Sequence, residues 1–134
     1  MAKSIFPDEM MSSGELSVDS IASELTLAHL RLHLVHWQTT NYAQHKALGD
    51  LYEYIQGFKD DVIEKLMGYT GKRPTIIRLK DISGVEPMVI VKSIASFAYS
   101  LYLWAGEKKY CDIENMAQEL SGQCAKTSYL LTLS

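Results

Sequence analysis

The segment from about residue 69 to residue 86 constrains the fold more than any other part of the chain. It contains Gly71, Pro74 and Gly84, whereas two helix-length apolar patterns precede it and two follow it. Glycine and proline interrupt regular helices, so this segment predicts a connection between two pairs of helices. With 134 residues, the chain is long enough for one domain with its own core.

The apolar residues on either side of this segment recur at the spacing of amphipathic helices. Ser17 and Asn41 are residue types that cap helix N-termini, and Pro87 suits a first helical turn. We therefore predict an all-α chain with helices at about Val18 to Thr39, about Tyr42 to Gly68, about Pro87 to Ala105, and from just after Asp112 onward.

The lengths of the connections predict the topology. Helices joined by a few residues, as across Thr39 to Asn41 and around Gly106 to Cys111, are antiparallel neighbours. The segment 69–86 could reach about 60 Å at about 3.3 Å per residue, whereas a helix of this length spans about 35 Å at about 1.5 Å per residue. Two helical hairpins joined by one such crossover form a ferritin-like four-helix bundle.

The first predicted helix carries two apolar stripes, displaced from each other by roughly 160–200° at about 100° per residue. A helix that packs within a monomer needs only one apolar stripe. The second stripe therefore predicts a homo-oligomer in which other helices bury its side chains. The first stripe consists of Ile21, Leu25, Ala28, Leu32 and Val35, and the second of Leu27, Leu30, Leu34 and Trp37.

Histidine and carboxylate residues gather in the first predicted hairpin. His36, His45, Asp60 and Glu64 are of the residue types that hold iron or zinc. Asp60 and Glu64 are four residues apart and share one side of a helix, which lies roughly 155–195° from the inward apolar stripe at about 100° per residue. A metal site is one interpretation. The alternative is that the two acids are ordinary solvated charges beside lysines.

The remaining histidines of the first helix allow a second interpretation. His29, His33 and His36 follow an i, i+4, i+7 pattern and share a broad face. Such a row could bind zinc or copper by itself. The alternative is that His29 and His33 are partly buried polar residues at an interface. Trp37 is interpreted first as a packing residue.

The stretch from His36 to Leu66 resembles the first helical hairpin of the Dps proteins, the small ferritins of starved and oxidatively stressed bacteria. In that family a His-Trp pair closes the first helix, and a His opens the second. An Asp and a Glu then follow at fixed offsets. Here the corresponding residues are His36-Trp37, His45, Asp60 and Glu64, and the likeness covers most of residues 25–82 and a little of the last helix.

The resemblance implies an iron site shared between subunits, with His36 and His45 from one subunit and Asp60 and Glu64 from its two-fold partner. Such a ferroxidase would oxidise Fe(II) with hydrogen peroxide or dioxygen and store ferric mineral in a dodecameric shell, which protects against oxidative damage. Zinc could substitute for iron. The alternatives are a ferritin-like assembly or interaction module with lost or weakened chemistry, and a non-redox zinc- or manganese-binding bundle.

Two departures from the family pattern bear on the number of metal ions. The loop between His36 and His45 is shorter than in the family. The family also has an Asp four residues after the second His, where this chain has Gly49 and places Asp50 one residue later. One residue turns a side chain by about 100° around a helix, so we predict one well-bound metal and expect Gly49→Asp to restore the missing oxygen. The last two predicted helices lack a Glu-x-x-His pair, which excludes an intra-bundle di-iron site.

Charge and composition exclude several other classes. The net charge is −3, and residues 1–14 hold one lysine against Asp8 and Glu9, so we expect weak or absent DNA binding. The basic cluster of Lys72, Arg73, Arg78 and Lys80 is interpreted as a solvated loop.

The N-terminus and the cysteines bear on location. Residues 1–16 carry no apolar stretch of a secretory signal and are expected to be flexible. Lys92 and several serines interrupt the apolar stretch from Met88 to Ala105, which argues against a membrane span. Cys111 and Cys124 do not have metal-ligand spacing, and a free buried thiol at Cys124 suits a reducing compartment. We therefore predict a cytoplasmic protein.

Overall fold

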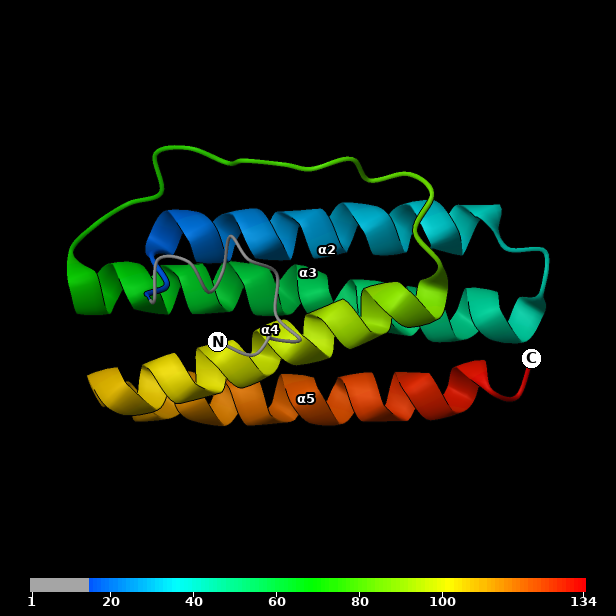
Figure 1. Ribbon diagram of the computed structural model, residues 1–134. Helices are drawn as coiled ribbons and strands as arrows, with labels where there is room; N and C mark the ends of the chain where they lie inside the picture. Colours follow the sequence, from blue (N-terminus) through cyan, green and yellow to red (C-terminus); the bar gives the residue numbers. More distant parts are fainter. Residues whose placement is uncertain (1–14) are drawn as a thin grey trace, which may run out of the picture.

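The computed structural model describes residues 15–134, and these residues form four α-helices (Figure 1). No strand occurs among them, so the all-α prediction is confirmed. Most of the N-terminal segment predicted to be flexible lies outside the described residues. The helices are α2 (Val18–Gln38), α3 (Tyr42–Thr70), α4 (Pro87–Lys108) and α5 (Cys111–Leu131).

Ser17 and Asn41, the two predicted N-cap residues, cap their helices in the structure. The Ser17 hydroxyl accepts a hydrogen bond of 3.0 Å from the backbone N–H of Ser20, whose own hydroxyl accepts one of 2.8 Å from the Ser17 N–H. At α3 the Asn41 side chain accepts from the Gln44 N–H at 2.9 Å. Gly71 closes that helix in the left-handed conformation, with φ of 70°, which a residue without Cβ adopts freely.

Helix α5 begins at Cys111, slightly before the predicted start after Asp112. Its N-cap residue, Tyr110, makes no side-chain capping bond, so no cap signal marks this boundary in the sequence. Asp112 and Glu114 lie in the first turn instead. There their negative charges interact favourably with the positive end of the helix dipole.

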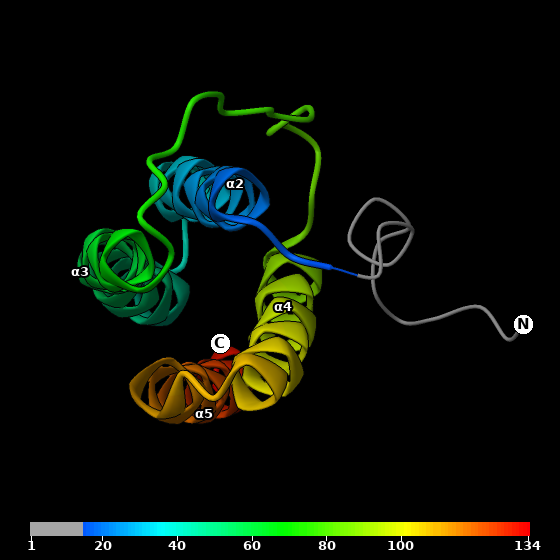
Figure 2. The same cartoon turned by 90° about the vertical axis from the view of Figure 1, so that its left-hand side faces the viewer.

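The helices pair as two antiparallel hairpins, α2 with α3 and α4 with α5, and α4 runs in the same direction as α3 (Figure 1). Figure 2 views the bundle nearly along the helices and shows all four around a common centre. Each helix buries one apolar stripe there. The fully buried side chains include Leu25, Leu32, Leu48, Ile55, Leu101 and Leu120.

The connection between α3 and α4 follows the outer side of α2 (Figure 1). The backbone N–H of Thr75 donates to Asp19 at 2.7 Å, and that of Arg78 donates to the Ser23 hydroxyl at 2.9 Å. Further on, the Arg31 guanidinium donates to the backbone carbonyl of Asp81 at 2.9 Å. Residues farther along the connection contact residues farther along α2. The connection therefore lies along α2 in an extended conformation.

This connection lies next to part of the second apolar stripe of α2. Leu27 is only 6% exposed and lines a cavity of about 490 Å³ together with Ile76 and Leu79 of the connection. Leu30 and Leu34 are half-buried, and Trp37 is 66% exposed. The chain itself therefore covers the beginning of the stripe, and the part near Trp37 is exposed in the single chain.

Helix α4 is the one helix of the described part that is long and apolar enough, by length and composition, to cross a membrane. Its apolar residues have a role within the bundle, because Ile90, Ile94, Phe97 and Leu101 are at most 3% exposed in the core.

Candidate metal centre

His36 and His45 face each other where the α2–α3 hairpin turns. Their rings stack with centroids 3.9 Å apart and planes 17° from parallel. The His36 Nδ1 lies 2.8 Å from the backbone oxygen of His45, and the His45 Nδ1 lies 2.9 Å from the backbone oxygen of His36. The structure thus brings together the two histidines that the sequence analysis selected.

This reciprocal pairing fixes the protonation pattern of both neutral rings. A carbonyl oxygen only accepts hydrogen bonds, so each Nδ1 must carry the proton and donate it. Each Nε2 then keeps a free lone pair, and neither makes a hydrogen bond within residues 15–134. Histidines that bind metals have this same arrangement, in which the second ring nitrogen is held by a carbonyl or carboxylate.

Gly49 provides the space for this arrangement. A Cβ atom at residue 49 would lie 2.8 Å from Cε1 and 3.0 Å from Nδ1 of His36. Such contacts are too short for unbonded atoms, so any larger residue would displace the His36 ring. Gly49→Asp would therefore do more than add a ligand oxygen, because the new Cβ would also shift the His36 ring.

Asp60 and Glu64 are exposed on α3 and line an open recess of about 720 Å³ with His29, Glu53 and Lys59. Asp60 follows His45 by fifteen residues of one helix, a distance of about 22 Å at about 1.5 Å per residue. One chain therefore cannot bring both pairs to one ion. Consistently, residues 15–134 contain no group of three or more His, Cys, Asp or Glu side chains placed to hold a metal.

His29 and His33 belong to an aromatic row that continues to His36, whose ring centroid lies 6.3 Å from that of His33. Tyr52 of α3 stacks on both His29 and His33, and its ring centroid lies 4.7 Å from that of His29 and 4.1 Å from that of His33. The ring centroids of His33 and Trp37 are 3.7 Å apart. Burial, the nearby Lys59 ammonium and His33 lower the pKa of His29. The Lys59 Nζ lies 3.3 Å from the His29 Nδ1, so a neutral ring accepts its hydrogen bond.

Sequence reasoning missed the structural roles of Gly49 and Tyr52. Tyr52 was not among the candidate residues, yet its ring stacks on two histidines one helical turn apart. The i, i+4 spacing of His29 and His33, together with an aromatic residue on the next helix, is the signal that could have identified this packing.

Comparison with known proteins gives relatives whose roles are not described. The chain is 24% identical over 130 residues to an "Uncharacterized 14.6 kDa protein in mobD-ri intergenic region" of Enterobacteria phage T4. The match covers 96% of this chain and 98% of the phage protein. No solved structure matches significantly. Residues 36–131, which include both histidines and both carboxylates, match the "Family of unknown function (DUF5856)", and the chain therefore belongs to that family.

Proposed function

We propose that the protein is a Dps-like mini-ferritin that captures Fe(II) at a site shared by two subunits, oxidises it and stores the ferric product. His36 and His45 of one subunit and Asp60 and Glu64 of its two-fold partner are the proposed ligands. Iron is the substrate of this reaction. The observation that carries the proposal is the pairing of His36 with His45, which leaves an unprotonated Nε2 on each ring.

The distance between the two ligand pairs supports a shared site. Within one chain they lie about 22 Å apart along α3 at about 1.5 Å per residue. If two α2–α3 hairpins pack face to face about a two-fold axis, the histidine end of each lies against the carboxylate region of the other. The exposed Trp37 and the half-buried Leu30 and Leu34 supply apolar surface on α2 for such a contact.

The order of the helices supports a ferritin-like assignment. Two helical hairpins joined by one long connection are characteristic of that fold, whereas simple up-down bundles have short connections throughout. Here the connection contacts α2 at Asp19, Ser23 and Arg31 in succession. On this proposal the subunits assemble further into a dodecameric shell in the cytoplasm, where the free thiols of Cys111 and Cys124 remain reduced.

The ligand set suits ferrous iron. Neutral imidazole nitrogen and carboxylate oxygen bind Fe(II) and leave coordination positions open for an oxidant. Two ferrous ions supply the two electrons that reduce one peroxide molecule to water. The protein holds each ion through His36 and His45 of one subunit and through Asp60 and Glu64 of the two-fold partner. Removing iron and peroxide together suppresses hydroxyl-radical formation, which is the protective role in this proposal.

Gly49 favours a second candidate function, a zinc- or manganese-binding bundle without redox turnover. Residue 49 is glycine and supplies no carboxylate to the centre, and the His36 ring occupies the space next to it. A site with one metal rather than two lacks an adjacent ion to share the electrons of an oxidant. Zinc binding without iron oxidation is the behaviour expected of this alternative.

Anaerobic titration of Fe(II) into the purified protein, followed by addition of hydrogen peroxide, tests the proposal. Wild type should bind about one ion per chain and oxidise it on addition of peroxide. His36→Ala and Glu64→Ala should each weaken binding by at least tenfold, because each removes one ligand. Asp50→Ala serves as the matched control, because Asp50 lies near the centre in sequence but pairs with Lys46 at 3.4 Å.

The outcomes separate the candidates. Fe(II) binding that depends on His36 and Glu64, followed by oxidation, supports the mini-ferritin. Binding of zinc with the same dependence but without iron oxidation supports the non-redox bundle. Equal binding by wild type and all three variants would show that neither His36 nor Glu64 is a ligand, and it would refute both candidates.

A further inference from the structure

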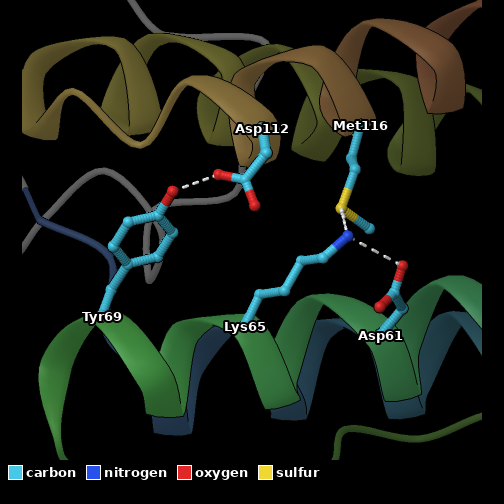
Figure 3. A network of polar contacts seen from close by, with 5 residues as sticks. All are labelled: Asp61, Lys65, Tyr69, Asp112 and Met116. Atoms are coloured by element: carbon cyan, nitrogen blue, oxygen red, sulfur yellow. Dashed lines mark hydrogen bonds and ion pairs between the residues drawn. The ribbon is translucent and has the colours of Figure 1, made fainter.

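A cluster of polar and aromatic side chains lies at the opposite end of the bundle from the histidines. It joins the end of α3 to the turn between α4 and α5. The Tyr69 hydroxyl of α3 donates a hydrogen bond to the Asp112 carboxylate of α5. Figure 3 shows this contact beside a second one, in which Lys65 reaches Asp61 and the Met116 sulfur.

Three aromatic rings lead from the core to this surface. Trp104 of α4 is 8% exposed, and its ring packs edge-on against Tyr110 with centroids 5.6 Å apart. Tyr110 stacks on Tyr69 with centroids 4.1 Å apart and planes 21° from parallel. Tyr69 is 44% exposed. The rings therefore form a continuous series of van der Waals contacts from a buried indole to a solvent-accessible phenol.

Both ends of this series have a carboxylate placed to take a proton. The Trp104 indole N–H donates to the Glu15 carboxylate at 2.7 Å, and the Tyr69 O–H donates to Asp112. Loss of one electron makes an indole or a phenol strongly acidic. A hydrogen-bonded carboxylate then lets the proton leave with the electron, so no unstable charged radical builds up.

We propose that Trp104, Tyr110 and Tyr69 form a route that moves a one-electron oxidation from the core to the surface, where Asp112 accepts the phenolic proton. A one-electron oxidant removes an electron from Trp104, and the indole proton moves to Glu15. An electron then passes from Tyr69 through Tyr110 to Trp104, which regains its proton. The Tyr69 O–H bond breaks, its proton goes to Asp112, and a neutral tyrosyl radical remains at the surface.

The protonation state of Tyr69 agrees with this sequence of events. The hydrogen bond to Asp112 raises the pKa of Tyr69 to about 12, so the phenol carries its proton at neutral pH and must release it on oxidation. The same bond lowers the pKa of Asp112, which keeps this carboxyl ionised and able to accept. This route does not depend on the proposed iron site and can be tested without metal.

Laser-flash photoionisation tests the route directly. The chain has two tryptophans, so Trp37→Phe leaves Trp104 as the only one, and light at the long-wavelength edge of indole absorption then oxidises Trp104. In this parent protein the absorbance of the tryptophanyl radical should decay as that of a tyrosyl radical rises, at one shared rate. Absence of that coupled change would overturn the proposal.

Two further variants in the same background test the assigned roles. Asp112→Asn keeps a carbonyl that can accept the Tyr69 hydrogen bond but cannot take the proton, and it should slow the transfer about tenfold, which corresponds to about 1.4 kcal/mol in the barrier. Tyr69→Phe keeps the ring stack, and it should greatly reduce the tyrosyl signal. Circular dichroism and thermal unfolding of each variant establish that the bundle is intact.

Tyr54→Phe is the matched control, because Tyr54 lies on α3 as Tyr69 does but stacks on Phe58 instead. It should leave the transfer rate unchanged. If Asp112→Asn and Tyr69→Phe also leave the rate and amplitude unchanged while the proteins remain folded, the Tyr69–Asp112 contact only joins α3 to α5, and the proposed route is refuted.

Discussion

The His36 imidazole lies directly against the backbone of Gly49, where a Cβ atom would come within 2.8 Å of the ring carbon Cε1. The two residues belong to different helices, α2 and α3. In this position the His36 Nδ1 lies 2.8 Å from the backbone oxygen of His45. A glycine that looks like a lost ligand in the sequence is therefore the residue that allows the histidine pair to form.

Gly49→Ala should disturb the histidine pair while keeping the fold. The added methyl group must push the His36 ring away from the His45 carbonyl, so the affinity for Fe(II) or Zn(II) should fall by about tenfold, or about 1.4 kcal/mol. Isothermal titration calorimetry under anaerobic conditions measures this change.

Gly122→Ala on α5 provides the comparison, because a Cβ there meets nothing within 4 Å. This substitution should leave metal affinity unchanged and stabilise the helix by about 0.5–1 kcal/mol. Equal metal affinities for Gly49→Ala and wild type would show that the position of the His36 ring has no part in binding.

Asp19 should hold the long connection against α2 in a pH-dependent manner. Its carboxylate accepts the Thr75 N–H at 2.7 Å and the Thr75 hydroxyl at 2.9 Å, and these bonds lower its pKa below the ordinary value of 3.8. Because the folded pKa is the lower one, the carboxylate stabilises the docked connection above pH 3.8, and this contribution is lost as the pH falls through the folded value. The amide resonance of Thr75 should titrate with a midpoint below 3.8.

Asp19→Asn should weaken the same contacts at neutral pH. Trypsin should then cleave after Arg78 or Lys80 severalfold faster than in wild type, because the docked connection protects these bonds only while it stays in place. Asp61→Asn, which removes an exposed ion pair with Lys65 on α3, should leave the cleavage rate unchanged. A Thr75 midpoint at or above 3.8, or unchanged cleavage in Asp19→Asn, would contradict this account of the connection.

The two cysteines should differ sharply in reactivity. Cys124 is 1% exposed, and burial raises its thiol pKa to about 12, whereas Cys111 is exposed at the start of α5. Because the thiolate is the reacting form, a maleimide should modify one cysteine per folded chain and both after denaturation. Mass spectrometry should locate the first modification at Cys111, and rapid labelling of Cys124 in the folded protein would disagree with a packed core.

Local signals predicted much of the fold. Ser17, Asn41 and Pro87 are located where the sequence analysis expected helices to begin, because a cap depends on residues within one turn of each other. The start of α5 was placed slightly late, since Tyr110 makes no capping bond that a sequence could reveal.

Contacts between distant segments were harder to predict. Leu27 is buried within the chain and lines one cavity with Ile76 and Leu79 of the connection, about fifty positions away, whereas periodicity alone assigned the whole stripe to a partner. The histidine pair was selected by residue type, but its reciprocal hydrogen bonds depend on how the short turn aligns two backbones. No sequence pattern specifies that alignment.

DNA binding should be weak at physiological salt. The net charge is −3, and the basic residues Lys72, Arg73, Arg78 and Lys80 form a single exposed cluster on the connection. Few phosphates can be neutralised by such a cluster, so any affinity should fall steeply with salt. A mobility-shift assay at physiological salt should show free duplex, and tight binding there would contradict this prediction.

Subunit complementation tests the shared site most directly. His36→Ala and Glu64→Ala should each bind little Fe(II) alone. When the two variants are unfolded together and refolded as a mixture, heterodimers form in which one chain supplies intact histidines and the other intact carboxylates. Each heterodimer then has one complete site, so the mixture should recover about a quarter of the wild-type sites. Recovery near that level supports a site built from two chains, and a mixture that binds no more than its separate components would contradict it.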